Sequence, residues 1–500
     1  MADRNQKRRR IDPQQLDPET RRRIERRRAE RRRRRRRNAL ILRGVCALVL
    51  ILLVVGIVVG ISTAVRNSRE KQEAQAQQER EERQLQEEQQ RSREQKIAQA
   101  EVMAQQYDYD GAIESIRSIE GAMEDADLVT MLADYEEAKS NLKTIPANKI
   151  THLSVRTLIA DPELVFTQEQ DTVAAQNRLT VDEFKKILQQ LYNNGYVLVS
   201  IHDLVSESEE GEFSSASVYL PEGKKPFILS QEDVCYDTSL AGQGYTVKLV
   251  LEDGKLVNQY QQADGTVVTG AYDVVPIVDE FIEEHPDFSY RGARGLLGFS
   301  GENGILGYQT SPADTASADS GTSSDEDTAQ DSGTETGDGA SAQTLQLSAE
   351  NTQEIENVKP VLEALRAEGW EFASSGYSRV SYGEDLAQMK EDADKWETYV
   401  ESVIGETDVL LFPYGTDIAA YTGYDEENEN YVYLRDKGFR FFCNIDSSQY
   451  WVQVATDYVR QGRRSIDGLR LYQDVQEGAD RLSDLFDASL VYDASRPSLG

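Results

Sequence analysis

The sequence predicts an α/β domain of alternating helices and parallel strands, carried on a single membrane span. Three stretches predict this organisation: an uncharged apolar run over residues 44–65, an amphipathic helix followed by a strand over residues 180–201, and an apolar strand over residues 226–229 that ends in Glu232 and Asp233. Helix-then-strand alternation is typical of parallel sheets. Two carboxylates at a strand end lie where α/β folds place their chemistry.

Charge is divided very unevenly along the 500 residues, whose formal net charge is −33. Residues 1–43 hold 19 Lys and Arg against 6 Asp and Glu, which leaves 36 basic and 82 acidic residues for the rest. Residues 44–65 carry no charge and are long enough to form a transmembrane helix. Arginine runs before such a span place the N-terminus in the cytoplasm and the bulk of the chain outside the cell. We therefore expect a single-pass protein of the cell membrane.

The basic region over residues 1–43 is expected to be a cytoplasmic tail, disordered until it binds anionic lipid. Nucleic acid is the alternative partner of a basic run, but the adjacent span favours the membrane. A cleavable signal peptide is the alternative for residues 44–65. The long basic region before it favours an uncleaved anchor instead.

Two helical segments are expected to follow the span. Residues 66–99 are mostly Glu, Gln, Arg, Lys and Ala, which predicts a solvated helical stalk, with a weak coiled coil as the alternative. Residues 100–145 show apolar residues at three- and four-residue steps, which predicts a helical hairpin resembling half of a tetratricopeptide unit.

The globular domain is expected over residues 150–475, with a C-terminal tail over residues 476–500. Asp-Gly pairs between alternating runs predict a three-stranded hairpin insertion over residues 245–270. Residues 311–344 are mostly Ser, Thr, Asp, Gly and Ala, which predicts a disordered acidic loop. Further helices are predicted at residues 180–193, 274–284, 354–368 and 386–404, and strands at residues 196–201 and 409–412.

Three blocks of sequence, taken in order, resemble the polysaccharide deacetylase family, also called the NodB-homology family or carbohydrate esterase family four. The first block joins the helix and strand of residues 179–204 to the acidic pair, the second is G-W-E-F-A-S-S-G-Y-S-R-V over residues 369–380, and the third is L-L-F-P-Y-G over residues 410–415. The resemblance implies a distorted (β/α) barrel of polysaccharide deacetylase type.

The resemblance also implies site residues, with two departures from the family pattern. The family's catalytic base and metal-binding aspartate correspond here to Glu232 and Asp233. The two metal-binding histidines of the second motif correspond to Ser375 and Arg379. Serine is a poor zinc ligand and arginine, being permanently cationic, cannot ligate at all. We therefore expect no bound cofactor, or zinc or another divalent metal if the site is active.

Aromatic residues of the second and third motifs are candidate substrate-binding residues, although each is equally compatible with a place in the core. They are Trp370, Tyr377, Phe412 and Tyr414, with Pro413 between the last two. His202 is expected to have a capping or core role. Cys235 and Cys443 are expected either to pair outside the cell or to be buried free thiols.

Three functions are compatible with this sequence. The favoured hypothesis is a metal-free pseudoenzyme that binds cell-envelope carbohydrate, in which Arg379 takes the place of the metal and pairs with Asp233 or Glu232. In the competing interpretation of the same residue, Arg379 points to solvent. The alternatives are an active metal-dependent deacetylase of cell-wall polysaccharide, which would be a C–N hydrolase, and a structural tether whose stalk and hairpin bind a partner.

Overall fold

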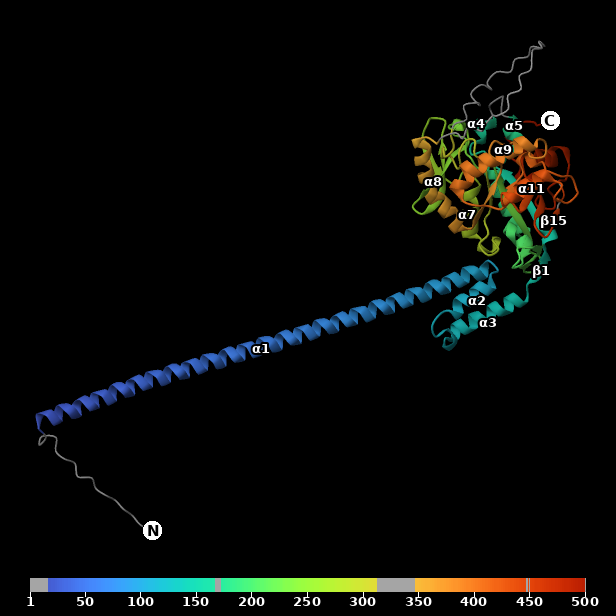
Figure 1. Cartoon of the computed structure of the whole chain (residues 1–500). Coiled ribbons are helices and arrows are strands. Elements are labelled where there is room, and N and C mark those ends of the chain that lie inside the picture. Colours follow the sequence, from blue (N-terminus) through green and yellow to red (C-terminus); the bar gives the residue numbers. More distant parts are fainter. Residues whose placement is uncertain (1–16, 167–171, 313–346, 447, 449, 500) are drawn as a thin grey trace. The chain divides into compact units, whose positions relative to one another are not determined.

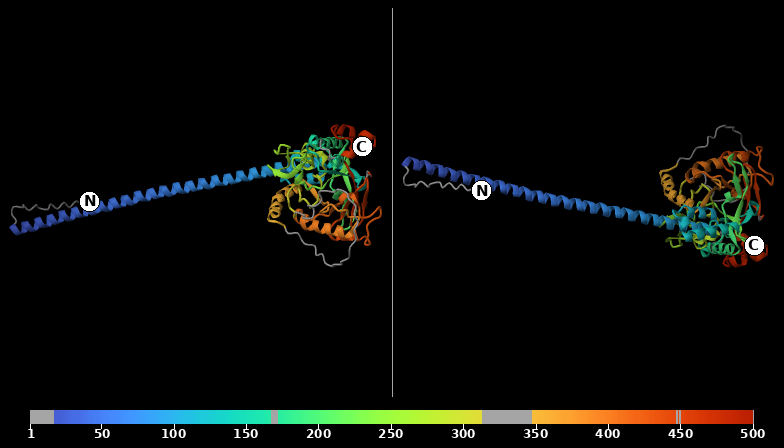
Figure 2. Two further views of the ribbon diagram at one scale, coloured as in Figure 1. Left: turned by 90° about the horizontal axis from the view of Figure 1, so that it is seen from above. Right: turned by 90° about the horizontal axis from the view of Figure 1, so that it is seen from below.

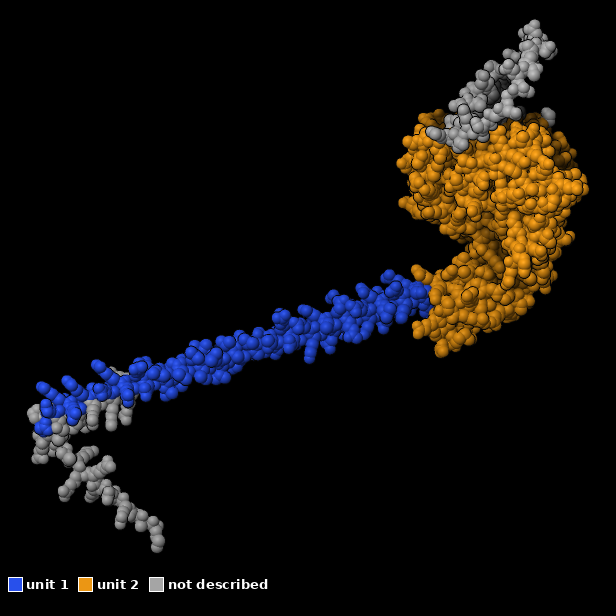
Figure 3. All heavy atoms as spheres, in the orientation of Figure 1, with its two compact units in different colours: residues 1–94 blue, residues 95–500 orange. Residues whose placement is uncertain are grey.

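The computed structural model describes residues 17–166, 172–312, 347–446, 448 and 450–499. The first 16 residues of the basic tail and residues 313–344 of the predicted acidic loop lie outside these ranges. The chain divides into two compact units, Met1–Glu94 and Gln95–Gly500 (Figure 3).

In the first unit, the described residues belong almost entirely to helix α1, Pro18–Gln105, whose last residues enter the second unit. The helix continues without a break through the basic, apolar and Glu- and Gln-rich stretches (Figures 1 and 2). By length and composition, it is the one helix among the described residues that could cross a membrane. From Pro18 onward the tail is helical rather than disordered, because Arg, Ala and Glu are good helix formers and residues 19–43 contain neither Gly nor Pro.

In the second unit, seven parallel strands form a closed ring in the order β7-β11-β12-β13-β14-β16-β2, with β2 pairing β7. These strands are β2 Thr151–Arg156, β7 Lys225–Glu232, β11 Gly295–Phe299, β12 Trp370–Ser374, β13 Val409–Leu411, β14 Phe441–Ile445 and β16 Val459–Ser465. Strand β3, Tyr196–Leu198, pairs with residues 225–227 at the start of β7. Strand β11 pairs with the same edge of β7 further along, and only at Ser230 and Gln231. This shared edge distorts the ring, and the predicted (β/α) barrel is confirmed.

Helices cover the outside of the ring, as Figure 1 shows for α7, α8, α9 and α11. The helices of this unit are α2 Tyr109–Arg117, α3 Ala126–Ser140, α4 Pro162–Phe166, α5 Thr172–Asn177, α6 Val181–Asn193, α7 Val274–Glu284, α8 Ala349–Glu368, α9 Leu386–Trp396, α10 Ser402–Ile404, α11 Glu429–Asp436, α12 Gly468–Tyr472 and α13 Ala488–Val491.

Alternate residues of each strand pack on opposite sides of the ring. On β7, Phe227 and Leu229 belong to the apolar cluster that includes Ile187 of α6 and Val361 of α8. Ile228, which lies between them, belongs to a separate cluster inside the ring with residues of the other strands. The barrel therefore has an apolar interior distinct from the core beneath its helices.

Short antiparallel sheets are attached to the barrel. They are β1 Lys143–Pro146 with β6 Ser217–Leu220, β4 Val205–Glu207 with β5 Phe213–Ser215, and the meander of β8 Thr246–Glu252, β9 Lys255–Gln261 and β10 Val267–Gly270, while β15 Val452–Val454 pairs antiparallel with β16. The meander is the predicted insertion. Its first turn places Asp253 and Gly254 at φ 50° and 80°, the left-handed pair that a two-residue hairpin requires.

The residues of the predicted C-terminal tail pack on the barrel. Leu485 and Phe486 are buried. Arg496 is paired with Glu183 of α6, and both side chains are fully buried. The Arg496 guanidinium also donates to the carbonyl oxygens of Ala175 and Arg178, so four contacts fix the end of the chain to α5 and α6.

Removal of the Arg496 side chain is expected to destabilise the barrel strongly. Arg496→Ala leaves Glu183 as a buried, unpaired charge, which costs about 3–5 kcal/mol. Urea unfolding of the full chain in maltoside micelles, followed by tryptophan fluorescence, measures the loss. Arg470→Ala removes a partly exposed pair with Asp467 and is expected to cost less than about 1 kcal/mol. Equal losses in the two variants would contradict the anchoring role of Arg496.

Candidate functional site

A small cavity of about 60 Å³ opens at the carboxyl ends of the barrel strands. Its walls are formed by Arg156, Glu232, Asp233, Ser375, Arg379, Leu411, Phe412, Pro413 and Tyr414. Parallel strands end on one face of a barrel, so segments far apart in the sequence meet there. The cavity thus unites residues from all three predicted motifs.

Glu232 ends β7, and its carboxylate is held by two guanidinium groups and a hydroxyl. Ser154 Oγ donates to Oε1 at 3.0 Å, and Arg463 Nη1 pairs with the same oxygen. Arg156 Nη2 lies 3.6 Å from Oε2. Arg463 is fully buried, whereas Arg156 is half-exposed. A buried guanidinium requires a counter-ion, and Glu232 provides it.

Asp233 is paired with Arg379, as expected from the sequence. Arg379 Nη1 donates to Asp233 Oδ2 at 2.6 Å, and Ser300 Oγ donates to Oδ1, also at 2.6 Å. Both partners adopt left-handed backbone conformations, with φ 62° at Asp233 and 56° at Arg379. Such conformations cost free energy and persist where the surroundings hold them. The alternative in which Arg379 points away into solvent is not observed.

The residues at this site do not fit a divalent metal. Both oxygens of Asp233 accept hydrogen bonds, one from a permanent cation. Ser375 Oγ is buried without a hydrogen-bond partner among the described residues, and a hydroxyl is a weak ligand. The described part of the chain contains no group of three His, Cys, Asp or Glu residues that could hold a metal ion. The positive charge beside Asp233 is the guanidinium of Arg379. A guanidinium donates hydrogen bonds but cannot bind and exchange ligands as a metal ion does.

The third motif forms an exposed wall of the cavity. Tyr414 is 70% exposed and lies at φ 55°. The next residue, Gly415, has φ 70°, and a Cβ at this position would come within 2.0 Å of Ile445. Glycine is therefore required at position 415. The preceding residue, Tyr414, lies at the rim of the cavity with its side chain largely exposed. Phe412 is buried, and its amide donates to Cys443 O at 3.0 Å.

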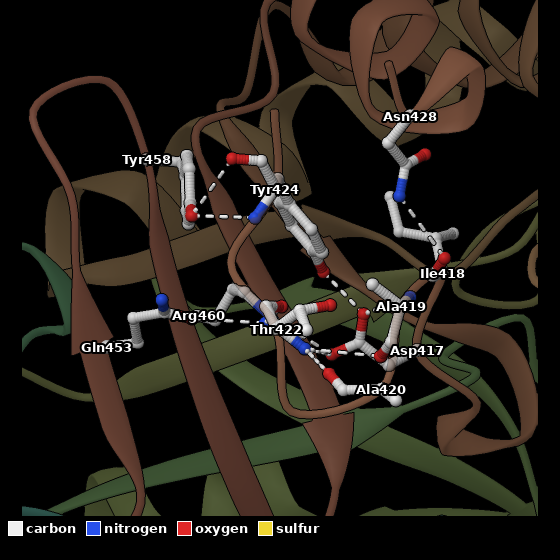
Figure 4. Close-up of polar contacts among 10 residues, drawn as sticks. All are labelled: Asp417, Ile418, Ala419, Ala420, Thr422, Tyr424, Asn428, Gln453, Tyr458 and Arg460. Atoms are coloured by element: carbon white, nitrogen blue, oxygen red, sulfur yellow. Dashed lines mark hydrogen bonds and ion pairs between the residues drawn. The ribbon is translucent and has the colours of Figure 1, made fainter. Parts of the chain in front are cut away.

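Arg460 anchors the loop that follows this motif (Figure 4). Its guanidinium, almost fully buried, contacts Asp417 Oδ2 at 2.8 Å and the carbonyl oxygens of Ala420 and Thr422. Tyr424 donates its hydroxyl hydrogen to the other oxygen of Asp417. The loop that continues from Tyr414 is thus held by a satisfied, buried polar network.

Three of the four candidate groove aromatics, Tyr377, Trp370 and Phe412, are buried. Tyr377 is fully buried, and its ring centroid lies 5.7 Å from that of Tyr399. Trp370, at the start of β12, is also buried and donates its indole hydrogen to Asp279 at 3.0 Å. A ring without exposed surface cannot stack on a ligand. Tyr377, Trp370 and Phe412 therefore take the core place that was the stated alternative to ligand binding, although Phe412 also lines the cavity.

None of the three histidines lines the cavity at Asp233. His152 lies inside the ring with Nδ1 3.0 Å from Gln461 Oε1, and burial, together with the nearby Arg463, lowers its pKa well below the usual value. His285 stacks on Tyr192.

His202 bridges two carboxylates, those of Glu371 and Asp408, at the other end of β12 and β13. This role differs from the capping or core role expected for His202.

The two cysteines of the barrel are free, so the disulfide alternative is not realised. Both thiols are buried, and burial raises the pKa of each to about 12. Buried thiols of such high pKa are inert at neutral pH.

Sequence reasoning missed several polar residues that shape the site. Arg463 lies on β16, Ser154 and Arg156 lie on β2, and Ser300 follows β11. The sequence carries no clear signal for burial of Arg463, because its strand reads V-R-Q-G-R-R-S and is mostly polar. That the partner is Glu232 depends on strand order, which residue patterns do not reveal.

No family model matches the chain, and no curated protein matches it either. Solved structures that resemble it include the Streptococcus pyogenes deacetylase PplD in complex with acetate, which is 10% identical with a TM-score of 0.30 over 65% of this chain and 94% of that one. The putative polysaccharide deacetylase BA0330 from Bacillus anthracis is 10% identical with a TM-score of 0.29 over 65% of each chain. The polysaccharide deacetylase BC0361 from Bacillus cereus is also 10% identical, with a TM-score of 0.29 over 64% of this chain and 65% of that one.

These three solved structures are of a deacetylase, a putative polysaccharide deacetylase and a polysaccharide deacetylase. The chain spans just under two thirds of each Bacillus protein. At 10% identity and these TM-scores, the likenesses assign this chain no activity, substrate or metal.

Removal of the Glu232 carboxylate is expected to destabilise the barrel because it leaves Arg463 buried and unpaired. Glu232→Leu should lower the free energy of unfolding by about 3–5 kcal/mol, whereas the double variant Glu232→Leu/Arg463→Met should recover most of that loss. Arg156→Met, which removes the half-exposed partner, is expected to cost less than about 1 kcal/mol. Urea unfolding of the full chain checks the series, and a double variant no more stable than Glu232→Leu would contradict the pairing.

The carboxylate clamp on His202 is expected to make stability depend on pH. Nδ1 lies 2.6 Å from Glu371 Oε1 and Nε2 lies 3.0 Å from Asp408 Oδ1. Burial lowers the pKa of His202, but hydrogen bonds to the two carboxylates outweigh it and raise the pKa to about 10. The folded protein thus holds a proton that the unfolded chain releases near pH 6.5. The resulting stabilisation is complete below pH 6.5 and is lost as pH rises towards 10.

Because the His202 side chain is half-exposed, solvent screening limits this stabilisation to about 1 kcal/mol. Unfolding free energies at pH 6.5 and pH 10 for the native chain and His202→Gln test this expectation. The variant should lose less stability over this interval than the native chain, while His285→Gln should behave like the native chain. Parallel pH dependence of the native chain and His202→Gln would refute the clamp.

Proposed function

We propose that this protein is a membrane-anchored pseudoenzyme that presents a metal-free, deacetylase-like barrel outside the cell and binds cell-envelope carbohydrate. The observation that carries the proposal is the ion pair between Arg379 and Asp233. The topology rests on the apolar segment of α1 and the arginine-rich residues before it. The same basic residues are suited to the anionic lipid of the inner leaflet.

Metal-dependent hydrolysis needs an activated water, a base and a polarising ion. A guanidinium supplies positive charge but binds no water as a ligand and cannot lower its pKa by coordination. The second acid, Glu232, serves as the counter-ion of Arg463. Both carboxylates are thus committed to arginines, which favours binding over catalysis.

The surface around the cavity supports carbohydrate as the ligand. The cavity of about 60 Å³ accommodates one polar substituent and not a whole sugar ring, so a polysaccharide would lie across the rim. There, the exposed ring of Tyr414 offers an apolar face and a hydroxyl, and the half-exposed Arg156 and Arg379 offer hydrogen-bond donors. Sugar rings have the matching chemistry, with apolar C–H faces and hydroxyl edges.

The full chain, purified in maltoside micelles without chelator, is expected to contain far less than stoichiometric zinc by plasma mass spectrometry. It is also expected to release no acetate from acetylated wall polysaccharide, because Arg379 occupies the metal's place. The double variant Ser375→His/Arg379→His restores two imidazole ligands beside Asp233 and should gain zinc. Near-stoichiometric zinc in the native chain, or acetate release that zinc stimulates, would overturn the proposal in favour of an active deacetylase.

Carbohydrate binding is measured on the same preparation by sedimentation with insoluble wall polysaccharide. Tyr414→Ala should weaken binding about tenfold, the effect of removing one well-placed aromatic contact of about 1–1.5 kcal/mol. Tyr219→Ala removes an exposed tyrosine of β6 that is not part of this cavity and should leave binding unchanged. Equal binding by all three proteins would reject this wall of the cavity as the carbohydrate surface.

A further inference from the structure

The cavity at Asp233 contains hydrogen-bond donors that the protein itself leaves unused. Arg156, the last residue of β2, lies 3.6 Å from Glu232, but its guanidinium makes no hydrogen bond to any residue that the structure describes. Ser375, which follows β12, is 5% exposed, and its hydroxyl also lacks a hydrogen-bond partner within the described ranges. Both side chains line the cavity. A buried polar group without a partner costs free energy, so the pair indicates a ligand that brings an acceptor.

The backbone holds Ser375 in place at the cavity. Its amide donates to Phe299 O at 3.0 Å, which fixes the residue to the end of β11. Gly298 of the same strand has no side chain, and a Cβ at that position would come within 2.3 Å of Ser375 Oγ. The glycine thus leaves the space that the hydroxyl occupies. Because this donor is positioned before a ligand arrives, binding costs little further ordering.

The balance of charge at the cavity favours an acceptor that is negative. Three guanidinium groups, those of Arg156, Arg379 and Arg463, lie against only two carboxylates. Arg379 donates to Asp233, and Arg463 donates to Glu232, both within hydrogen-bonding distance. Arg156 is therefore the third cation and has only a longer contact with a carboxylate that is already paired. An anion beside Arg156 would receive charge-assisted hydrogen bonds, which are stronger than those to a neutral acceptor.

The size and the surroundings of the cavity favour a small group with a single negative charge. A volume of about 60 Å³ is several times what one water molecule needs, so the three heavy atoms of a carboxylate group fit. A doubly charged phosphate would be repelled more strongly by Glu232 and Asp233 in the lining, and by Glu302, whose charge acts on Arg379 from outside the lining. The acidic excess of the chain opposes any anion at long range, but physiological salt screens charges more than about 8 Å away.

We propose that this cavity binds a carboxylate group carried by the polysaccharide, so that the ligand is an acidic glycan. Arg156 donates to the carboxylate, whose planar shape matches a guanidinium, and the Ser375 hydroxyl donates to the same group. The exposed ring of Tyr414 contacts the sugar that carries it. This inference rests on the proposed function, because it names the class of glycan that the same site binds.

Sedimentation with insoluble wall polysaccharide tests the proposal when the carboxylates of one portion are first converted to methylamides with carbodiimide and methylamine. The full chain in maltoside micelles should bind the untreated polymer about tenfold more tightly, because the amide lacks the charge that Arg156 requires. Equal binding to both polymers would overturn the acidic ligand and leave carbohydrate binding in place. Binding to neither polymer would overturn carbohydrate binding itself, and this inference with it.

Matched variants separate the cavity from the arginine-rich tail, which also attracts acidic polymers. Arg156→Met should weaken binding of the untreated polymer about tenfold and bring it close to that of the amidated polymer. Ser375→Ala should weaken it about threefold to fivefold, because one hydrogen bond to a charged group is lost. Arg470→Met removes a partly exposed arginine outside the cavity and should retain the native affinity. A native preference for the untreated polymer in both Arg156→Met and Ser375→Ala would refute the carboxylate site.

Small competitors identify what carries the carboxylate. Methyl glucuronide, an acidic sugar, should displace the polymer at about one tenth of the concentration required of methyl glucoside or of acetate, because only the acidic sugar contacts both Arg156 and Tyr414. Acetate as effective as methyl glucuronide would overturn a site for a glycan carboxylate in favour of one for free carboxylates. Methyl glucoside as effective as methyl glucuronide would overturn the role of the charge.

Discussion

The barrel depends on the neutralisation of Arg463, a charge enclosed by a ring of strands whose interior is otherwise largely apolar. Glu232 pairs with Nη1, and the carbonyl oxygen of Phe412 lies 3.4 Å from Nη2. These contacts join β16 to the ends of β7 and β13 at the mouth of the ring. The same cation helps to keep His152, deeper in the ring, in its neutral form. A buried charge of this kind tolerates few arrangements, so it specifies how the strand ends meet.

In the function that we propose, the second guanidinium, that of Arg379, takes the place of a metal ion without loss of shape. A carboxylate at the end of a barrel strand is costly to leave unpaired, and a positive charge beside it removes the cost whether the charge is an ion or a side chain. The electrostatic requirement of the fold is thereby met. Metal-dependent hydrolysis also needs a cation that binds and exchanges water, and a guanidinium does not do this because it coordinates no ligand. Structure and catalysis make different demands on the same position, and in the function that we propose Arg379 meets the structural one.

The surface that we propose for carbohydrate recognition uses a tyrosine at the start of a loop that buried polar contacts hold in place. At the barrel mouth, the Arg460 network anchors the loop that continues from Tyr414 (Figure 4). A rigid aromatic wall loses little conformational entropy on binding, which suits a ligand such as a sugar ring that presents an apolar C–H face.

The sequence by itself determined what depends on neighbours along the chain. The apolar span, the helical stalk, the amphipathic helix at residues 181–193 and the meander with its Asp-Gly turn all follow from local period and composition. The three motifs also sufficed to bring Glu232, Asp233 and Arg379 into one hypothesis. Only the tertiary structure decided that Arg463 faces Glu232, that Tyr377 is buried beneath the site and that residues 476–499 pack on the barrel. These facts depend on strand order and on which side of the ring a residue faces, and such long-range pairing leaves no mark in local residue patterns.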